Sequence, residues 1–182
     1  MSTTKSRIKI KLTSGEQITV QDLPKNRIKK ALLERVLPAQ VPDAELLSVC
    51  DTHGSVQHLD EGAFERFGLS LKDYSVLPDV VAYSKNSDTL LFIETIHGHG
   101  SIDRSRYAEL CHWTRDVKCR TAFVSVFASR GAYAKQFSST VMRSHIWFAD
   151  APRHSVSTSS TTEEAMAIME RHVAYHAERR QR

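Results

Sequence analysis

The sequence predicts an α/β fold in which a central mixed β-sheet is flanked by helices. Apolar segments rich in β-branched residues, which are typical of buried strands, alternate with segments whose apolar residues recur at helical spacing. A short run of turn-forming residues joins two strand segments and predicts an antiparallel pair, whereas helical segments separate the later strands. The order helix, strand, hairpin, helix, strand, helix, strand therefore implies a mixed sheet.

The beginning of the chain predicts a small hairpin and a helix. Residues 7–12 (RIKIKL) and 17–20 alternate between polar and apolar side chains on either side of a Ser-Gly turn. Residues 26–37 carry apolar side chains at helical spacing. Proline lacks the backbone N–H and clashes with the preceding turn, so Pro38 is expected to end this helix.

A buried strand and a short helix follow. Residues 45–50 (ELLSVC) form an apolar run bounded by a proline and by the polar turn residues 51–54. Residues 60–67 predict a helix that Gly68 closes, because glycine readily adopts the left-handed conformation at a helix end.

The central segments predict an antiparallel hairpin. Residues 79–83 (DVVAY) and 89–96 (TLLFIETI) are rich in β-branched and apolar residues, and the turn-formers at 85–88 separate them. Further along, helical and strand patterns alternate. They are a helix at 101–114 with its cap near Ser101 and Asp103, a strand at 121–127, a helix at 131–138, a strand at 145–149 and a helix from 162 to about 179.

The length of 182 residues fits a single domain with a buried core. We expect a core over residues 18–154, a Ser/Thr-rich linker at 155–162 and a basic C-terminal helix at 163–182. No apolar run approaches the ~20 residues of a membrane helix, and the first twelve residues lack the apolar segment of a signal peptide. The three cysteines show no CxxC spacing, which suits reduced thiols. We therefore expect a cytoplasmic protein without membrane contact.

The composition allows a nucleic-acid partner without requiring one. Hydrophobic residues make up 41% and charged residues 25% of the chain, which excludes wholesale disorder. The net charge of +4 is a mild excess that a polyanionic ligand or a plain solvated surface would equally explain.

Two acidic residues stand out in the predicted hairpin. Asp79 heads the first strand and Glu94 lies near the end of the second, so the hairpin can bring them together at one end. A carboxylate in an apolar strand is costly unless it is paired or binds a cation. Two such carboxylates suit Mg²⁺, which prefers oxygen ligands and keeps several waters. The alternative is that Asp79 only caps a strand and Glu94 faces solvent.

The spacing of Pro78-Asp79 and Glu94 matches the PD-(D/E)xK nuclease core, a short and degenerate motif. The wider chain adds further segments in a fixed order. These are Lys25-Asn26, 49–52 (VCDT), 67–69 (FGL), 77–81 (LPDVV) with Tyr83, 91–94 (LFIE), His99-Gly100, Arg106, Glu109-Leu110, 123–127 (FVSVF), 146–150 (IWFAD) and Pro152. With them the chain resembles the BsuBI/PstI family of type II restriction endonucleases, specifically its C-terminal nuclease domain.

That resemblance implies a restriction-endonuclease-like core and a Mg²⁺-dependent, site-specific deoxyribonuclease. Its substrate would be double-stranded DNA, cut by a homodimer, and a methyltransferase partner would accompany it. Asp79 and Glu94 would be the catalytic metal ligands. Family members are typically longer, with an N-terminal helical domain, so we expect only the nuclease domain here. Sequence specificity would then be reduced, supplied by another chain, or lost.

The sequence departs from the motif at the position of its lysine. Ile96 stands two residues after Glu94, where the lysine that orients or activates the attacking water is expected. His97 and His99 are the nearest substitutes, because an imidazole can accept a proton near neutral pH. His99 could equally be a turn residue between two glycines. Glu34 could be a third acid or a solvated helix charge. A second departure is Arg153, which stands where the family usually has an acidic residue.

Several basic and polar residues are candidate DNA contacts. Ser101, Arg104 and Arg106 open the helix after the Glu94 strand, where a helix N-terminus and arginine can hold a phosphate. Arg106 could instead pair with Glu94 or Glu109. Further backbone contacts could come from basic residues on the first helix and the tail, namely Lys25, Lys29, Lys30, Arg179, Arg180 and Arg182.

Two other functions stay open. A catalytically inactive DNA-binding or regulatory relative of the same fold would explain the missing lysine and the missing domain. An unrelated α/β protein that acts on a small phosphorylated substrate would apply only if the resemblance misleads.

Overall fold

The computed structural model describes residues 6–71, 74–98, 102–136 and 144–157. The strands are β1 Arg7–Lys11, β2 Gln17–Gln21, β3 Ala44–Cys50, β4 Val56–Leu59, β5 Val80–Ser84, β6 Thr89–Ile96, β7 Arg120–Phe127, β8 His145–Phe148 and β9 Ser155–Ser157. The helices are α1 Pro24–Ala31, the π-helical η1 Leu32–Val36, α2 Leu37–Gln40, α3 Glu61–Phe67, the 3₁₀ turn η2 Tyr74–Val76, α4 Arg104–Trp113 and α5 Arg130–Ala134.

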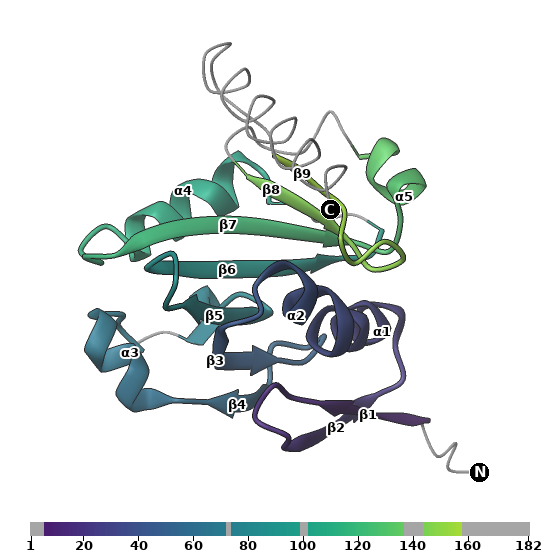
Figure 1. Cartoon of the computed structure of the whole chain (residues 1–182), viewed down its shortest axis with the longest axis horizontal. Coiled ribbons are helices and arrows are strands. Elements are labelled where there is room, and N and C mark those ends of the chain that lie inside the picture. Colours follow the sequence, from purple (N-terminus) through teal and green to yellow (C-terminus); the bar gives the residue numbers. More distant parts are fainter. Residues whose placement is uncertain (1–5, 72–73, 99–101, 137–143, 158–182) are drawn as a thin grey trace, which may run out of the picture.

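A seven-stranded mixed sheet forms the centre of the molecule, which confirms the predicted fold class (Figure 1). Its order is β4-β3-β5-β6-β7-β8-β9. Neighbours from β4 to β6 run antiparallel, β6, β7 and β8 run parallel, and β9 returns antiparallel. The parallel pairs arise where α4 and α5 form crossovers between strands, as expected for helix-containing connections. Strands β1 and β2 pair in a separate antiparallel sheet.

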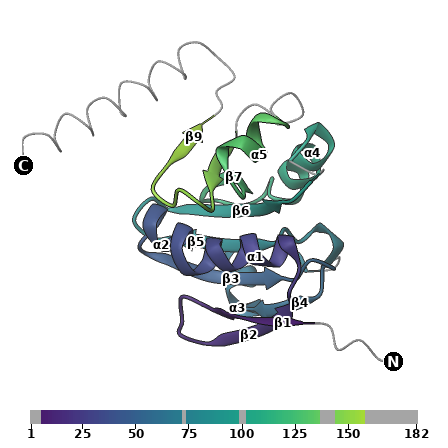
Figure 2. The same ribbon diagram turned by 90° about the vertical axis from the view of Figure 1, so that its right-hand side faces the viewer.

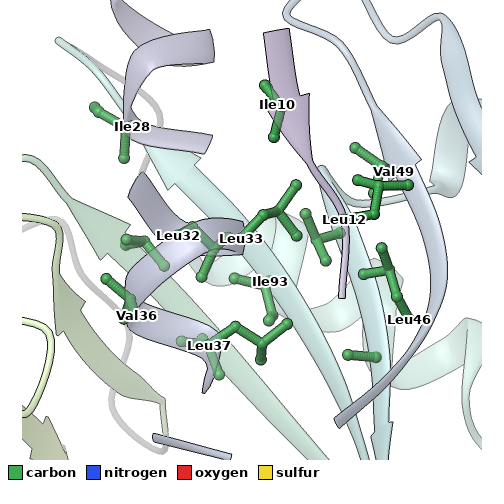
Figure 3. Close-up of a cluster of buried hydrophobic side chains, with 14 of the residues drawn as sticks. Ile10, Leu12, Ile28, Leu32, Leu33, Val36, Leu37, Leu46, Val49 and Ile93 are labelled. Carbon is green, nitrogen blue, oxygen red and sulfur yellow. The ribbon is translucent and has the colours of Figure 1, made fainter. Parts of the chain in front are cut away.

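Two hydrophobic layers cover the two faces of the sheet. On one face, α1, η1, α2 and the β1–β2 hairpin pack onto alternate residues of β3, β5 and β6, including Val49 and Ile93 (Figure 3). On the other face, α3 and α4 cover the intervening residues, with Phe92 and Leu110 among the buried side chains. Figure 2 shows α1 and α2 lying along one side of the sheet and α4 standing apart from them. The period-two alternation in the strands therefore divides their side chains between two cores.

Most predicted elements are confirmed, with small shifts at their ends. Asp60 caps α3 by accepting a hydrogen bond from the Ala63 backbone N–H at 2.9 Å, and Gly68 ends the helix with a φ of 72°. Asp103 caps α4 in the same way. The helix predicted at 131–138 is present as α5 but ends at Ala134, and residues 135–136 form a turn. Residues 137–138 and the predicted C-terminal helix lie outside the described residues.

The prediction that Pro38 ends the first helix is wrong. The helix continues through the wider turn of η1 to Gln40. The Leu37 N–H bonds to the Leu32 carbonyl, five residues back, instead of to Leu33. We attribute the accommodation of Pro38 to this wider turn. The turn makes room for the proline ring, and no helical hydrogen bond is lost because proline has no backbone N–H.

Two edge strands escaped the sequence analysis. Strand β4 follows a turn that was expected to be loop, and β9 lies at the start of the predicted Ser/Thr-rich linker. Both are short and carry polar residues, and each pairs along only one side because it closes an edge of the sheet. A strand that is stabilised mainly by hydrogen bonds to its neighbour needs few apolar residues, so its sequence shows little hydrophobic alternation. Over the described ranges, no helix is both long enough and apolar enough to span a membrane.

Replacing Phe92 tests the packing of the α3–α4 core. The Phe92 side chain is fully buried, and its ring centroid lies 5.6 Å from that of Trp113 and 5.8 Å from that of Phe123. Phe92→Ala should lower the free energy of unfolding by about 3–5 kcal/mol, because it removes buried area and leaves a cavity. Urea unfolding measures the change. Val156→Ala, at an exposed position, should stay within about 0.5 kcal/mol of the parent; equal losses in both variants would contradict this packing.

Candidate functional site

The register of the central hairpin brings Asp79 and Glu94 to the same end of the sheet. Strands β5 and β6 pair as Val80 with Ile93, so the next position along each strand places Asp79 beside Glu94. The same end of the sheet is where β3 finishes, and the Cys50 N–H donates to the Asp79 carbonyl at 2.8 Å. Continuation of this register would bring the two acidic residues to one end of the strand pair, and their joint role in a site stays a prediction.

The Asp79 carboxylate is buried and almost enclosed by donors. Its side chain is 5% exposed. One oxygen accepts hydrogen bonds from the Thr95 backbone N–H at 2.8 Å and from the Thr95 hydroxyl at 2.7 Å, and the Lys25 ammonium lies 3.0 Å from it. The other oxygen accepts a hydrogen bond from the Lys29 ammonium at 3.0 Å. Burial opposes the charge, but Lys29 and Lys25 prevail and lower the pKa of Asp79.

Lys29 is a buried ammonium with two strong partners. Its side chain has no exposed surface, and besides Asp79 it donates to the Cys50 carbonyl. Burial lowers the pKa of Lys29, and the charge of Asp79 works in the opposite direction. The pair therefore ties α1 to the ends of β3 and β5, since loss of Asp79 would leave the Lys29 charge buried without a counter-charge in contact.

The N-terminus of α1 is fixed by a polar anchor that holds both lysines in place. The Asn26 amide donates to the Gln21 carbonyl at 2.9 Å, and the Thr52 hydroxyl donates to the Asn26 side-chain oxygen at 2.8 Å. Lys25 and Lys29 are one helical turn apart and so project from the same face of α1. That face points to the end of the sheet where Asp79 lies.

Glu94 is held from the opposite helical layer. Its side chain is 14% exposed, and one of its oxygens accepts two hydrogen bonds from the Arg106 guanidinium, at 3.0 and 2.8 Å. Arg106 also donates to Glu109 at 2.5 Å and to the Val76 carbonyl at 3.0 Å. Within the described part of the chain, the second Glu94 oxygen, Oε2, receives no hydrogen bond.

The two carboxylates repel one another across the strand pair. Burial raises the pKa of Glu94, and the neighbouring charge of Asp79 raises it further, against the opposing effect of Arg106. A divalent cation between them would offset both effects, and carboxylate oxygens are the ligands that Mg²⁺ prefers. Among the described residues, no group of three or more His, Cys, Asp or Glu side chains is arranged to hold a metal ion. Asp79 and Glu94 would be carboxylate ligands, with water at other positions. This donor set fits Mg²⁺, which keeps several waters when bound.

The other predicted site residues differ in their exposure and in whether the structure describes them. His97 is exposed directly after β6, whereas His99 and Ser101 lie outside the described residues. Arg104 is exposed at the first residue of α4, where a phosphate could reach it.

Two of the basic residues predicted to contact DNA are engaged inside the protein. Lys29 has no surface with which to reach a phosphate, and Arg106 holds Glu94 and Glu109 at once. Lys30 is 41% exposed but pairs with Glu34 at 2.6 Å. Glu34 also accepts a hydrogen bond from the β1 backbone, which supports its alternative as a surface charge.

The sequence did not predict that Lys25, Lys29 and Thr95 contact the Asp79 carboxylate. The i, i+4 spacing of the two lysines indicated a common face, but nothing in the sequence says that this face meets the end of β5. Thr95 alternates with Glu94 and so points to the other side of β6. Its bonds to Asp79 depend on the strand pairing, which only the folded sheet provides.

Comparison with known proteins places these residues in a wider context. A family model described as the BsuBI/PstI restriction endonuclease domain matches residues 8–161. The type II restriction enzyme BsuBI of Bacillus subtilis is 27% identical over 149 residues, which are 82% of this chain and 47% of that enzyme. The structure of the SdaI restriction endonuclease is similar with a TM-score of 0.78 and 24% identity, covering 85% of this chain and 49% of that one. The chain therefore spans about half the length of these relatives.

Replacing Lys29 tests whether the buried ion pair holds the site together. Lys29→Met should lower the free energy of unfolding by about 3 kcal/mol, because it leaves part of the Asp79 charge uncompensated in the core. Urea unfolding measures this loss. Adding Asp79→Asn to that variant should recover part of the stability, since the uncompensated charge is then gone. Lys30→Met, at the surface, should change stability by less than about 1 kcal/mol; a loss as large as that of Lys29→Met would argue against the pair.

The Cys50 thiol provides a chemical probe of how closed the site is. Burial raises the pKa of Cys50 to about 11, and the residue is 3% exposed. At pH 8 only about one thiol in a thousand would be ionised, so Cys50 should not react with Ellman's reagent in the folded protein. The Cys50→Ser variant should release as much thionitrobenzoate as the parent when folded and less when unfolded in guanidinium. If the folded Cys50→Ser variant released less thionitrobenzoate than the folded parent, Cys50 would be accessible to the reagent and the site would be open.

Proposed function

This chain belongs to the BsuBI/PstI restriction endonuclease domain family, and we propose that it is a Mg²⁺-dependent type II endonuclease that hydrolyses phosphodiester bonds of double-stranded DNA. The observation that carries the proposal is the pair of buried carboxylates at one end of the sheet. Both acids lie next to the paired residues Val80 and Ile93, and the charge of Asp79 adds to burial in raising the pKa of Glu94.

Asp79 and Glu94 would hold the ion. When bound, Mg²⁺ supplies positive charge for the scissile phosphate and makes an attacking water more acidic. The Oε2 atom of Glu94 is our candidate for a metal ligand, because Arg106 donates only to Oε1 and no other described residue donates to Oε2. Thr95 and Lys29 fix the Asp79 carboxylate, and Arg106 fixes that of Glu94, so both ligands are orientated before DNA arrives.

Residues at the exposed rim would bind the DNA backbone and assist the water. Arg104 at the start of α4 is our candidate for a phosphate contact, and Ser101 and Lys30 remain weaker candidates. His97 follows β6 directly and is exposed, so it could accept a proton from the attacking water. His99 shares that proposal through its closeness in sequence.

The proposed assembly follows from the substrate. Both strands of a palindromic site can be cut by two copies related by two-fold symmetry, so we propose a homodimer. The chain matches about half the length of its relatives, and we propose that residues 1–182 form a single nuclease domain.

A second candidate is a DNA-binding relative without catalysis. The observation in its favour is that a protein cation already lies against each carboxylate and that Ile96 stands at the motif lysine. Under this alternative the cations would replace the metal instead of orienting its ligands.

Conservative replacement of the carboxylates separates the two candidates. With supercoiled plasmid and Mg²⁺, Glu94→Gln and Asp79→Asn should each lower the cleavage rate at least about 10³-fold, which corresponds to about 4 kcal/mol of activation free energy. The rate should also vanish when EDTA removes the metal. Discrete fragments would indicate a site-specific enzyme, and diffuse nicking would place specificity elsewhere.

Asp116→Asn is the matched control, because Asp116 is 80% exposed and pairs with Arg115 on the surface. It should cleave as the parent does. If the parent left the plasmid intact in Mg²⁺ and in Mn²⁺ yet bound it in a gel-shift assay, the binding alternative would replace our proposal.

A further inference from the structure

The strand that carries Glu94 offers no ammonium group to the proposed site. Ile96, two residues on and on the same face, is 2% exposed and packs against Phe127, Ile146 and Phe148. Its side chain is part of the core and has no polar atom. A cation that touches the scissile phosphate or the attacking water must therefore come from another element.

Helix α1 brings two lysines to the site, one fully buried and one partly exposed. Lys29 is fully buried and donates to both Asp79 and the Cys50 carbonyl. Lys25 is 30% exposed, and its ammonium lies 3.0 Å from Asp79 Oδ2. Within the described residues this ion pair is its one polar contact. An ammonium has three N–H donors, and the contact with Asp79 uses one of them, so this partly exposed side chain has the capacity to bind a ligand as well.

Lys25 acts on both carboxylates. Its charge lowers the pKa of Asp79 and also that of Glu94, although burial dominates at Glu94. The geometry places the Lys25 ammonium against Asp79 Oδ2, with partial access to solvent.

The other cations near the site are less suited to this task. Arg106 donates to Glu94, to Glu109 and to the Val76 carbonyl. Lys30 projects from another face of α1 and pairs with Glu34 while donating to the Lys9 carbonyl at 2.6 Å. Of the described cations that touch the two carboxylates, Lys25 is the most exposed and makes the fewest bonds.

On the basis of the proposed nuclease function, we propose that Lys25 is a catalytic residue whose ammonium takes the place of the strand lysine missing at Ile96. In this role it leaves Asp79 Oδ2 on substrate binding and donates to the scissile phosphate and the attacking water. Lys29 remains against Asp79 as a positioning residue.

The reaction that Lys25 assists is a simple hydrolysis. The water oxygen forms a bond to phosphorus, and the phosphorus–oxygen bond to the departing sugar breaks. The proton that the water loses balances the proton that the departing oxygen gains. Lys25 contributes positive charge and hydrogen bonds as negative charge grows on the phosphate oxygens, and such interactions accelerate the step only when they strengthen in the transition state.

The test compares Lys25→Met and Lys25→Arg with the parent chain on supercoiled plasmid, with enzyme in excess. Cleavage in Mg²⁺ gives the rate constant at saturation, and gel shift in Ca²⁺ gives plasmid affinity. Lys25→Met should lower the rate constant about 10²–10³-fold, the usual loss for one transition-state donor, with affinity within about threefold of the parent. Lys25→Arg should restore part of the rate because it keeps the positive charge. Thermal unfolding should change little in either variant.

Lys85→Met is the matched control, because Lys85 is 73% exposed at the β5–β6 turn, at the far end of the hairpin from the site. It should cleave as the parent does. Parent-like cleavage by Lys25→Met would overturn the inference and leave the nuclease function standing. A loss explained by weaker plasmid binding would also overturn it. If Lys25→Met unfolds, Lys25→Gln is measured in the same way and decides between the same outcomes. A parent chain that cleaves nothing in Mg²⁺ or Mn²⁺ would overturn the proposed function and the inference together.

Discussion

A buried carboxylate at the end of a sheet must be surrounded by donors or cations, because the unpaired charge would cost several kcal/mol. Asp79 satisfies this requirement with groups from separate parts of the chain: two lysines of α1 and both the backbone and the hydroxyl of Thr95 on β6. Its own carbonyl accepts from Cys50 at the end of β3. One charged group therefore fixes how α1 sits on the sheet and where three strands end.

The second carboxylate belongs to the opposite layer. Glu94 is held by Arg106 of α4, on the face of the sheet away from α1. The two helical layers thus converge on one end of the β5–β6 pair, each with its own cations. Each carboxylate has a positive neighbour, and burial together with the charge of Asp79 still raises the pKa of Glu94. A divalent cation would offset both effects, and this supports the proposed metal site.

In the motif, one strand carries both the metal-binding acid and the lysine; in our proposal, strand β6 carries the acid and helix α1 carries the lysine. An ammonium acts on a phosphate or a water through its position in space, so a different sequence position can supply it. The anchor of Asn26 by Gln21 and Thr52 gives α1 the precision that a strand would otherwise provide. The wider turn of η1 lets the same helix continue past Pro38, so that Leu37 also packs in the core beneath it.

The sequence by itself determined the class of fold, the central hairpin, the cap of α3 and the two acidic residues, because periodicity, turn residues and an acid in an apolar strand are local properties. It could not reveal that Lys29 is buried or that Thr95 bonds to Asp79, and it could not decide between a phosphate and Glu94 as the partner of Arg106, since each depends on which elements pack together. The edge strands β4 and β9 were missed for the same reason: their stability comes from a neighbour more than from their own residues. Tertiary structure alone decided which of several lysines meets the acidic pair.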